Sequence, residues 1–118
     1  MKKKILLVED ERALCLLYEE ELSREGYEIT AVTDAEAALA ALRSTHFDLI
    51  VTDIRMPGKN GIELITQIMG LRKDIPIIIN SAYQSHKEDF MTWAADAYVV
   101  KSSSLDELKL KIKELIGE

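Results

Sequence analysis

Five short runs of strand length, four of them largely apolar and all separated by segments with helical spacing, constrain this chain more than any other feature. The runs cover residues 5–8, 27–32, 47–52, 75–79 and 97–100. Continuous apolar runs of this length are typical of parallel strands that are buried on both faces. Parallel strands need long crossover connections, so the segments between them are expected to be helices that cover both faces. The pattern predicts an α/β fold with a doubly wound, five-stranded parallel sheet and five helices.

The first expected helix covers residues 12–25, with Asp10 as its N-cap and Gly26 as its stop signal. Capping-box patterns begin at Thr33, Ser85 and Ser104, and each predicts a helix that starts there. The remaining helix is expected from residue 60 to about residue 70. A length of 118 residues without a linker or repeat predicts one domain, residues 1–118.

Charge and composition exclude several classes of partner. The net charge is −6, which argues against direct binding of nucleic acid or of an anionic membrane surface, since both favour a basic face. The single cysteine, Cys15, cannot form an internal disulfide. The sequence contains no signal peptide and no apolar run of 18 residues, so a cytoplasmic location is expected.

Polar residues follow four of the five expected strands. The first strand ends in Glu9 and Asp10, the third in Asp53, the fourth in Ser81 and the fifth in Lys101. All parallel strands end at the same edge of the sheet, which is where open α/β sheets hold their ligands. These five residues are therefore expected on one rim, although they are far apart in the sequence.

The residue types on this rim point to phosphoryl chemistry. Three carboxylates at one place repel one another, and at least one should have a raised pKa. A hard divalent cation would relieve this repulsion, and an oxygen-only site suits Mg²⁺. Lys101 would add a positive charge and Ser81 a hydroxyl donor, which together with the cation would surround a transferring phosphoryl group. Asp53 remains as the nucleophile that would form an acyl phosphate.

Each residue on its own has an ordinary explanation. A single acidic residue after a strand is more often a helix cap, a single lysine is usually a solvated charge, and a single serine indicates almost nothing. It is the occurrence of all five at strand ends that favours a functional site.

The chain resembles the receiver domain of bacterial two-component response regulators along nearly its whole length. The motifs that carry the resemblance are residues 5–10, 51–58 (Val-Thr-Asp-Ile-Arg-Met-Pro-Gly), 60–61, 81–83 and 98–101. The resemblance implies a flavodoxin-like sheet with strand order 2-1-3-4-5. It also implies a phosphoprotein of a phosphorelay rather than an enzyme, one that catalyses only its own phosphorylation and dephosphorylation.

The resemblance implies a role for each site residue. Asp53 would accept a phosphoryl group from a phosphohistidine, and Ser81 and Lys101 would bind its oxygens. Mg²⁺ would be held by Asp10, Asp53 and the backbone carbonyl of Arg55, with Glu9 acting mainly through a metal-bound water. Ser81 would move toward the phosphoryl group, and Tyr98 would turn inward behind it.

The implied partners are a sensor histidine kinase or phosphotransfer protein and a downstream output domain or protein. The kinase would dock partly on the first helix, near Leu14 and either Leu17 or Tyr18. The signal would leave through the face made by the fourth helix, fifth strand and fifth helix, and a homodimer on phosphorylation is compatible with this. Either the chain acts alone through that face, or an output domain follows it.

The chain departs from the common family pattern at several positions. Glu9 replaces the more frequent Asp, and Ser81 stands where Thr is commoner. Ser102 replaces a proline that usually follows Lys101, so the Lys101–Ser102 bond is either a costly cis bond or a trans bond that changes the approach of Lys101. Arg55 and Tyr83 are bulky and are expected to limit hydrolysis of the acyl phosphate.

Two rival functions remain open at this point. A flavodoxin-like cofactor binder would share the fold, but its first loop should cradle phosphate with hydroxyl and backbone N–H groups. Here that loop is Glu9–Glu11, which repels phosphate unless a cation intervenes. The second rival is a degenerate receiver that is never phosphorylated and serves only as an interaction module. A nucleotide hydrolase is disfavoured because no Gly-rich Lys-Ser/Thr loop is present.

Overall fold

The computed structural model describes residues 2–53, 61–71, 74–82, 95–102 and 104–117. Within them, five strands form one sheet in the order β2-β1-β3-β4-β5, and every neighbouring pair is parallel. The strands are β1 (Lys4–Val8), β2 (Glu28–Val32), β3 (Leu49–Thr52), β4 (Ile77–Ser81) and β5 (Ala97–Val100). The predicted fold class and the flavodoxin-like strand order are confirmed.

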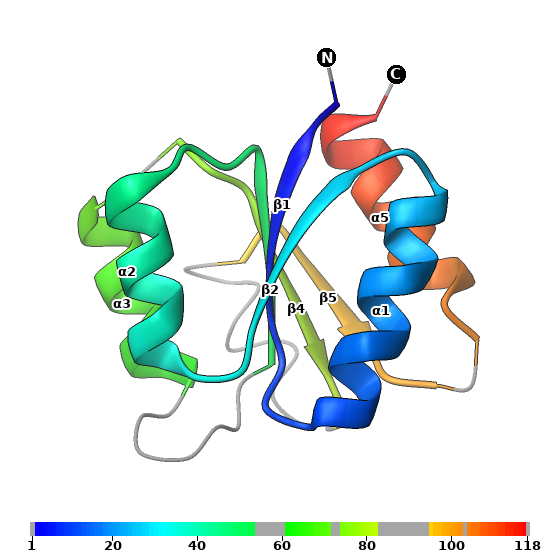
Figure 1. Ribbon diagram of the computed structural model, residues 1–118, viewed down its shortest axis with the longest axis horizontal. Helices are drawn as coiled ribbons and strands as arrows, with labels where there is room; N and C mark the ends of the chain where they lie inside the picture. Colours follow the sequence, from blue (N-terminus) through cyan, green and yellow to red (C-terminus); the bar gives the residue numbers. More distant parts are fainter. Residues whose placement is uncertain (1, 54–60, 72–73, 83–94, 103, 118) are drawn as a thin grey trace.

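Helices cover both faces of the sheet, as the doubly wound prediction requires. Figure 1 shows the sheet nearly edge-on, with α2 and α3 on one side and α1 and α5 on the other. The bounds are α1 (Arg12–Arg24), α2 (Ala35–Ser44), α3 (Gly61–Leu71) and α5 (Asp106–Ile116). The helix predicted to begin at Ser85, which carries His86, Phe90 and Trp93, lies outside the described residues. No helix in the described ranges is long and apolar enough to cross a membrane.

Alternating side chains of the central strands supply two separate hydrophobic cores. In β1, Leu6 and Val8 belong to the core under α2 and α3, while Ile5 and Leu7 belong to the core under α1 and α5. All four side chains are at most 1% exposed. This explains why the central strands appear in the sequence as apolar runs, since neither of their faces meets water.

Helix α1 packs on the sheet through Cys15, Tyr18 and Leu22, all of which are buried. On its outer side, Leu16 is 63% exposed and Leu17 is 45% exposed. The helix ends at Arg24, one residue before the predicted end. Gly26 follows the C-cap as the predicted stop signal, and its φ of 98° is a left-handed conformation that glycine adopts without steric cost.

The predicted strand boundaries are wrong by about two residues at β3 and β4. β3 begins at Leu49 rather than at Phe47, which is buried but precedes the ladder. β4 begins at Ile77, because Pro76 has no N–H to give to the ladder. It also extends through Ser81, whose carbonyl accepts the N–H of Lys101 at 2.7 Å.

The prediction that Asp10 caps α1 is wrong. The N-cap residue is Glu11, and its side chain makes no capping hydrogen bond. The N–H of Glu11 instead donates to Oε2 of Glu9 at 3.1 Å. Asp10 is therefore not used to end a helix, and its carboxylate lies with other acidic groups described below.

The other two testable capping-box predictions are each wrong by one residue. The N-cap of α2 is Asp34 rather than Thr33, and Oδ1 of Asp34 accepts the N–H of Ala37 at 2.7 Å. The N-cap of α5 is Leu105 rather than Ser104, although the Ser104 hydroxyl accepts an N–H of the first turn at 3.2 Å. In both cases a neighbouring polar side chain still satisfies an unpaired amide.

The topology places a ligand site between β1 and β3. From β1 the chain runs to β2 on one side, and it then returns past β1 to form β3 on the other side. A reversal of this kind leaves a crevice at the carboxyl ends of the two strands, where open α/β sheets bind their ligands. Glu9 and Asp10, which follow β1, and Asp53, which follows β3, border this crevice.

Replacing Leu22 with alanine should destabilise the protein markedly. Leu22 is fully buried between α1 and the sheet, so Leu22→Ala removes apolar contact and leaves a cavity. We expect a loss of about 2–5 kcal/mol in the free energy of unfolding, measured by urea denaturation. Leu16→Ala on the same helix is the matched control and should change stability by no more than about 0.5 kcal/mol. Equal losses in the two variants would contradict this packing of α1.

Candidate functional site

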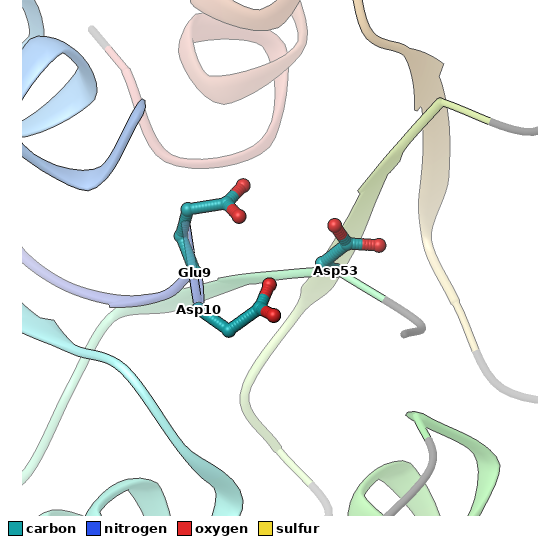
Figure 2. Close-up of side chains that lie close together, drawn as sticks. All are labelled: Glu9, Asp10 and Asp53. Carbon is teal, nitrogen blue, oxygen red and sulfur yellow. The ribbon is translucent and has the colours of Figure 1, made fainter. Parts of the chain in front are cut away.

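Three carboxylates meet where β1 and β3 end. Val8 is aligned with Thr52 in the sheet, so Glu9 and Asp53 leave the ladder next to each other. The Asp53 N–H donates to the Val8 carbonyl at 3.2 Å, which fixes the start of the second loop against the first strand. Figure 2 shows the side chains of Glu9, Asp10 and Asp53 gathered around a common space. One oxygen from each carboxylate lies within 4.8 Å of the others.

Lys101 enters this acidic group from the end of β5. Its backbone N–H donates to the Ser81 carbonyl, which extends the ladder between β4 and β5 by one bond. Its Nζ lies 2.7 Å from Oε1 of Glu9 and 2.7 Å from Oδ2 of Asp53. One ammonium therefore bridges carboxylates from two different strands. The side chains of Lys101, Glu9 and Asp53 are 13%, 2% and 10% exposed, respectively, so the bridge has little contact with solvent.

The proton affinities of the bridge follow from burial and pairing. Burial raises the pKa of the Glu9 carboxyl, and hydrogen bonds from Lys101 and from the Glu11 N–H only partly offset the rise. Burial acts to lower the pKa of Lys101, but hydrogen bonds to Asp53 and Glu9 outweigh it and leave that pKa above its ordinary value. The expectation that at least one carboxyl would have a raised pKa is confirmed for Glu9. The main cause is desolvation rather than repulsion between carboxylates.

The donors of the acidic group suit a hard cation. Glu9 and Asp53 are buried while Asp10 is exposed, so the group opens to solvent on the side of Asp10. All three contribute carboxylate oxygens only, and oxygen ligands are those that Mg²⁺ and Ca²⁺ prefer. The predicted rim thus has the chemistry that a divalent cation requires.

Ser81 and Tyr98 lie behind the rim rather than on it. Ser81 is the last residue of β4 and is fully buried, so the expectation that it follows the strand is wrong. Tyr98 is buried in β5, in the core under α2 and α3. Side chains alternate between the two faces along β4, so Ser81 lies on the same face as Ile79. Ile79, like Tyr98, belongs to the core under α2 and α3.

Several predicted features fall on or beside undescribed segments. Arg55 and Tyr83, with the Met-Pro-Gly motif, lie outside the described residues. The described part of the chain contains no cis peptide bond, so the Lys101–Ser102 bond is trans. The sequence left this question open, and the trans bond still brings the Lys101 ammonium to Asp53.

Sequence reasoning missed one contact and one buried polar residue at this site. It assigned Glu9 to a metal-bound water and did not predict the Glu9–Lys101 ion pair, although the extra methylene of Glu over the commoner Asp was a signal. It also overlooked Asn80, a polar residue at the end of an apolar run, which is 4% exposed.

The chain is similar to known proteins of one family. The profile of the response regulator receiver domain matches residues 5–113. The two-component response regulator PhoP of Pseudomonas aeruginosa is 36% identical over 115 residues, which are 96% of this chain and 51% of that protein. The transcriptional regulatory protein RprY of Bacteroides fragilis is 35% identical over 118 residues, 98% of this chain and 50% of that protein. The chain thus spans about half the length of these curated relatives.

Solved structures agree with these similarities. The response regulator TrrA of Thermotoga maritima, crystallised in complex with Mg(2+)-BeF, is 46% identical and superposes with a TM-score of 0.91. The alignment covers 97% of this chain and 99% of that one. TrrA in complex with the histidine kinase ThkA superposes with a TM-score of 0.89 over 97% of this chain and 98% of that chain.

Removing the Lys101 charge should make stability depend on pH in metal-free solution. In Lys101→Met, Glu9 and Asp53 lose their shared cation, so the pKa of Glu9 should rise further above its ordinary 4.5. The folded state then binds more protons than the unfolded state between these two pKa values, and stability falls as pH rises through that window. We expect a loss of about 3 kcal/mol at pH 7 and a clearly smaller loss at pH 5, from urea denaturation with a chelator present.

Lys109→Met provides the matched control for this pH dependence. Lys109 pairs with Glu21 at 3.1 Å between α5 and α1, far from the acidic group. Its loss should have the same small effect at both pH values. An equal destabilisation of Lys101→Met at pH 5 and pH 7 would show that the bridge does not control the protonation of Glu9.

Proposed function

This chain belongs to the family of response regulator receiver domains, and we propose that Asp53 accepts a phosphoryl group with the help of Mg²⁺. One observation carries the proposal. Asp53 lies at the carboxyl end of β3, with Lys101 on its carboxylate and the oxygens of Glu9 and Asp10 beside it. A nucleophile, a cation and a set of metal-ligating oxygens are thus present at one place.

The Asp53 carboxylate is the nucleophile. An oxygen of Asp53 attacks the phosphorus of a phosphohistidine on the donor protein, a P–O bond forms, and the P–N bond breaks. The imidazole leaves with the electron pair of that bond and takes up a proton, and Asp53 becomes an acyl phosphate. Positioning and charge stabilisation are the main contributions that a protein makes to such a transfer.

Lys101 and Ser81 are the phosphoryl-binding residues. The Lys101 ammonium, 2.7 Å from Oδ2 of Asp53, is close enough to transfer its hydrogen bond to an oxygen of the new phosphoryl group. Its second partner, Glu9, keeps it at the site during that exchange. Ser81 would approach the phosphoryl group through its hydroxyl, and the backbone bond from Lys101 to Ser81 links the two groups.

The acidic group is proposed to hold Mg²⁺ through Asp10, Asp53 and the backbone carbonyl of Arg55, with Glu9 acting through a metal-bound water. When bound, the cation would neutralise charge on the transferring phosphoryl oxygens. The fit rests on the three carboxylate oxygens that lie within 4.8 Å of one another. Arg55 and Tyr83 are proposed to limit the hydrolysis of the acyl phosphate.

The proposed phosphodonor is a sensor histidine kinase or a phosphotransfer protein. Support comes from the ThkA complex of the similar protein TrrA. The exposed side chains of Leu16 and Leu17 make α1 a candidate docking surface. Tyr18, which was an alternative to Leu17, is only 2% exposed and cannot contribute to a surface. We place this exchange in the cytoplasm.

The proposed output is a change on the face of β5, α5 and the fourth helix predicted to begin at Ser85. Tyr98 lies three residues before Lys101 on β5, so movement at the site reaches it along one strand. We propose that residues 1–118 form one receiver unit and that an output domain or a separate protein reads this face, with or without a homodimer. The curated relatives are about twice as long, which supports an output domain.

The acyl phosphate should be detectable directly. Incubation with Mg²⁺ and acetyl phosphate should add one phosphoryl group to the wild-type protein, as measured by intact mass. Asp53→Asn should show no adduct because its amide oxygen is not a nucleophile of comparable strength. The absence of an adduct on the wild type would favour the degenerate receiver, and an equal adduct on Asp53→Asn would place the phosphoryl group elsewhere.

Mg²⁺ binding should depend on Asp10 far more than on its neighbour Glu11. Asp10→Asn removes one charged ligand from the acidic group and should weaken Mg²⁺ binding roughly tenfold or more, measured by isothermal titration calorimetry. Glu11→Gln removes an exposed carboxylate from the same loop, outside the group, and should leave the dissociation constant within about twofold. Similar losses in both variants would indicate a diffuse effect of negative charge instead of a site.

A further inference from the structure

Thr52, the last residue of β3, is a buried polar residue to which the proposed reaction assigns no role. The residue is fully buried, and its hydroxyl donates a hydrogen bond to the backbone carbonyl of Asp53 at 2.9 Å. The hydroxyl therefore contacts the residue that is proposed to accept the phosphoryl group, and it does so at the backbone rather than at the carboxylate.

The residues beside Thr52 on the sheet are apolar. Side chains two residues apart on a strand share a face, so Thr52 lies on the same face as Ile50, in the core under α2 and α3. On the neighbouring strands it is aligned with Val8 and Ile79, which belong to the same core. Valine has nearly the same shape as threonine and favours strands as strongly, so it would fit at this position. Packing alone therefore does not require a hydroxyl here.

The hydroxyl of Thr52 belongs to a set of hydrogen bonds that hold Asp53 at three points. The Asp53 N–H donates to the Val8 carbonyl at 3.2 Å, and the Asp53 carbonyl accepts from the Thr52 hydroxyl. Oδ2 of Asp53 accepts from Nζ of Lys101 at 2.7 Å. Both backbone groups of Asp53 are thus attached to the central strands, one through β1 and the other through β3. The carboxylate therefore extends from a backbone that is held on both sides of the Cα atom.

This attachment matters because Asp53 is the first residue beyond the strand ladder. The aligned pairs of β1 and β3 end at Val8 and Thr52. Beyond them, regular strand geometry no longer fixes the rotation about the bond between Cα and the carbonyl carbon. The Thr52 hydroxyl restrains this rotation because it holds the carbonyl oxygen. A buried hydrogen bond largely offsets the cost of desolvating its own two groups, so what it adds here is mainly orientation.

We propose that Thr52 is a positioning residue, whose hydroxyl holds the Asp53 backbone in the orientation that directs its carboxylate toward the phosphorus and the metal. A nucleophile that must rotate into place reacts more slowly, and a misplacement of about 1 Å can cost about a hundredfold in rate. Thr52 acts in this proposal only through Asp53. The inference rests on the proposed phosphoryl transfer to Asp53.

The test compares two pairs of proteins that differ at position 52 by the presence of a hydroxyl. The wild type is compared with Thr52→Val, and Thr52→Ser is compared with Thr52→Ala. Each protein is incubated with saturating Mg²⁺ and acetyl phosphate, and the adduct is followed by intact mass over time. Urea denaturation gives the folded fraction of each protein, and calorimetry gives its Mg²⁺ dissociation constant. Thr30→Val is the control, because Thr30 is exposed on β2 and the same change is made there.

We expect each protein without the hydroxyl to be phosphorylated about fivefold more slowly per folded molecule than its partner. Mg²⁺ binding should weaken about threefold in the same comparisons, which is less than the loss of a direct partner of the carboxylate would cause. Stability should follow a different order. Thr52→Ser loses a buried methyl group and should have a lower urea midpoint than Thr52→Val, yet it should react faster. Thr30→Val should keep the wild-type rate and Mg²⁺ affinity.

A wild-type rate per folded molecule in Thr52→Val, with equal rates in Thr52→Ser and Thr52→Ala, would overturn the positioning role while leaving phosphorylation of Asp53 intact. A purely structural hydroxyl would give that result, since it would change the urea midpoint alone. If Thr52→Val fails to fold, the comparison of Thr52→Ser with Thr52→Ala decides the question. If the wild-type protein itself gains no phosphoryl group, the proposed function fails and this inference fails with it.

Discussion

The ammonium of Lys101, shared between Glu9 and Asp53, is the interaction on which the rest of the site depends. Glu9 and Asp53 are buried at the ends of adjacent strands, and neither carboxylate can offset the cost of removing the other from water. Lys101 offsets this cost from the end of a third strand, and its backbone N–H is hydrogen-bonded to the Ser81 carbonyl. The carboxylates of two loops therefore share one ammonium, whose position is set by the sheet.

The sheet determines which residues can take part. Reversal of the strand order at β1 places the ends of β1 and β3 next to each other, and the parallel direction brings the end of β5 to the same edge. The two hydrophobic cores hold the strands from both faces, which leaves the loops at this edge to carry polar groups. The same arrangement explains why Asp10 is not a helix cap, because its carboxylate belongs to the acidic group and the N-cap of α1 is the next residue, Glu11.

The parallel sheet and most of the site residues could be predicted because they follow from a pattern in the sequence. Apolar runs of strand length predicted the parallel sheet. The position of Glu9, Asp10, Asp53 and Lys101 directly after such runs predicted that they lie on one rim. Boundaries such as the extension of β4 to Ser81 could not be predicted, since they depend on a hydrogen bond between strands that are distant in the sequence. The Glu9–Lys101 pair was missed for a similar reason. It joins two elements whose separation is fixed only after the sheet has formed.

The pairing of Lys101 with two carboxylates also suits a site that must exchange partners. A buried ammonium that lost its only partner would be left with an uncompensated charge, at a cost of about 3–5 kcal/mol. Because Glu9 and Asp53 lie at the same distance from Nζ, Lys101 can release Asp53 and remain paired with Glu9. The side chain of Glu at position 9, longer than the more frequent Asp, therefore matters for holding the lysine. The proposed transfer of Lys101 to a phosphoryl oxygen then requires no intermediate with a bare buried charge.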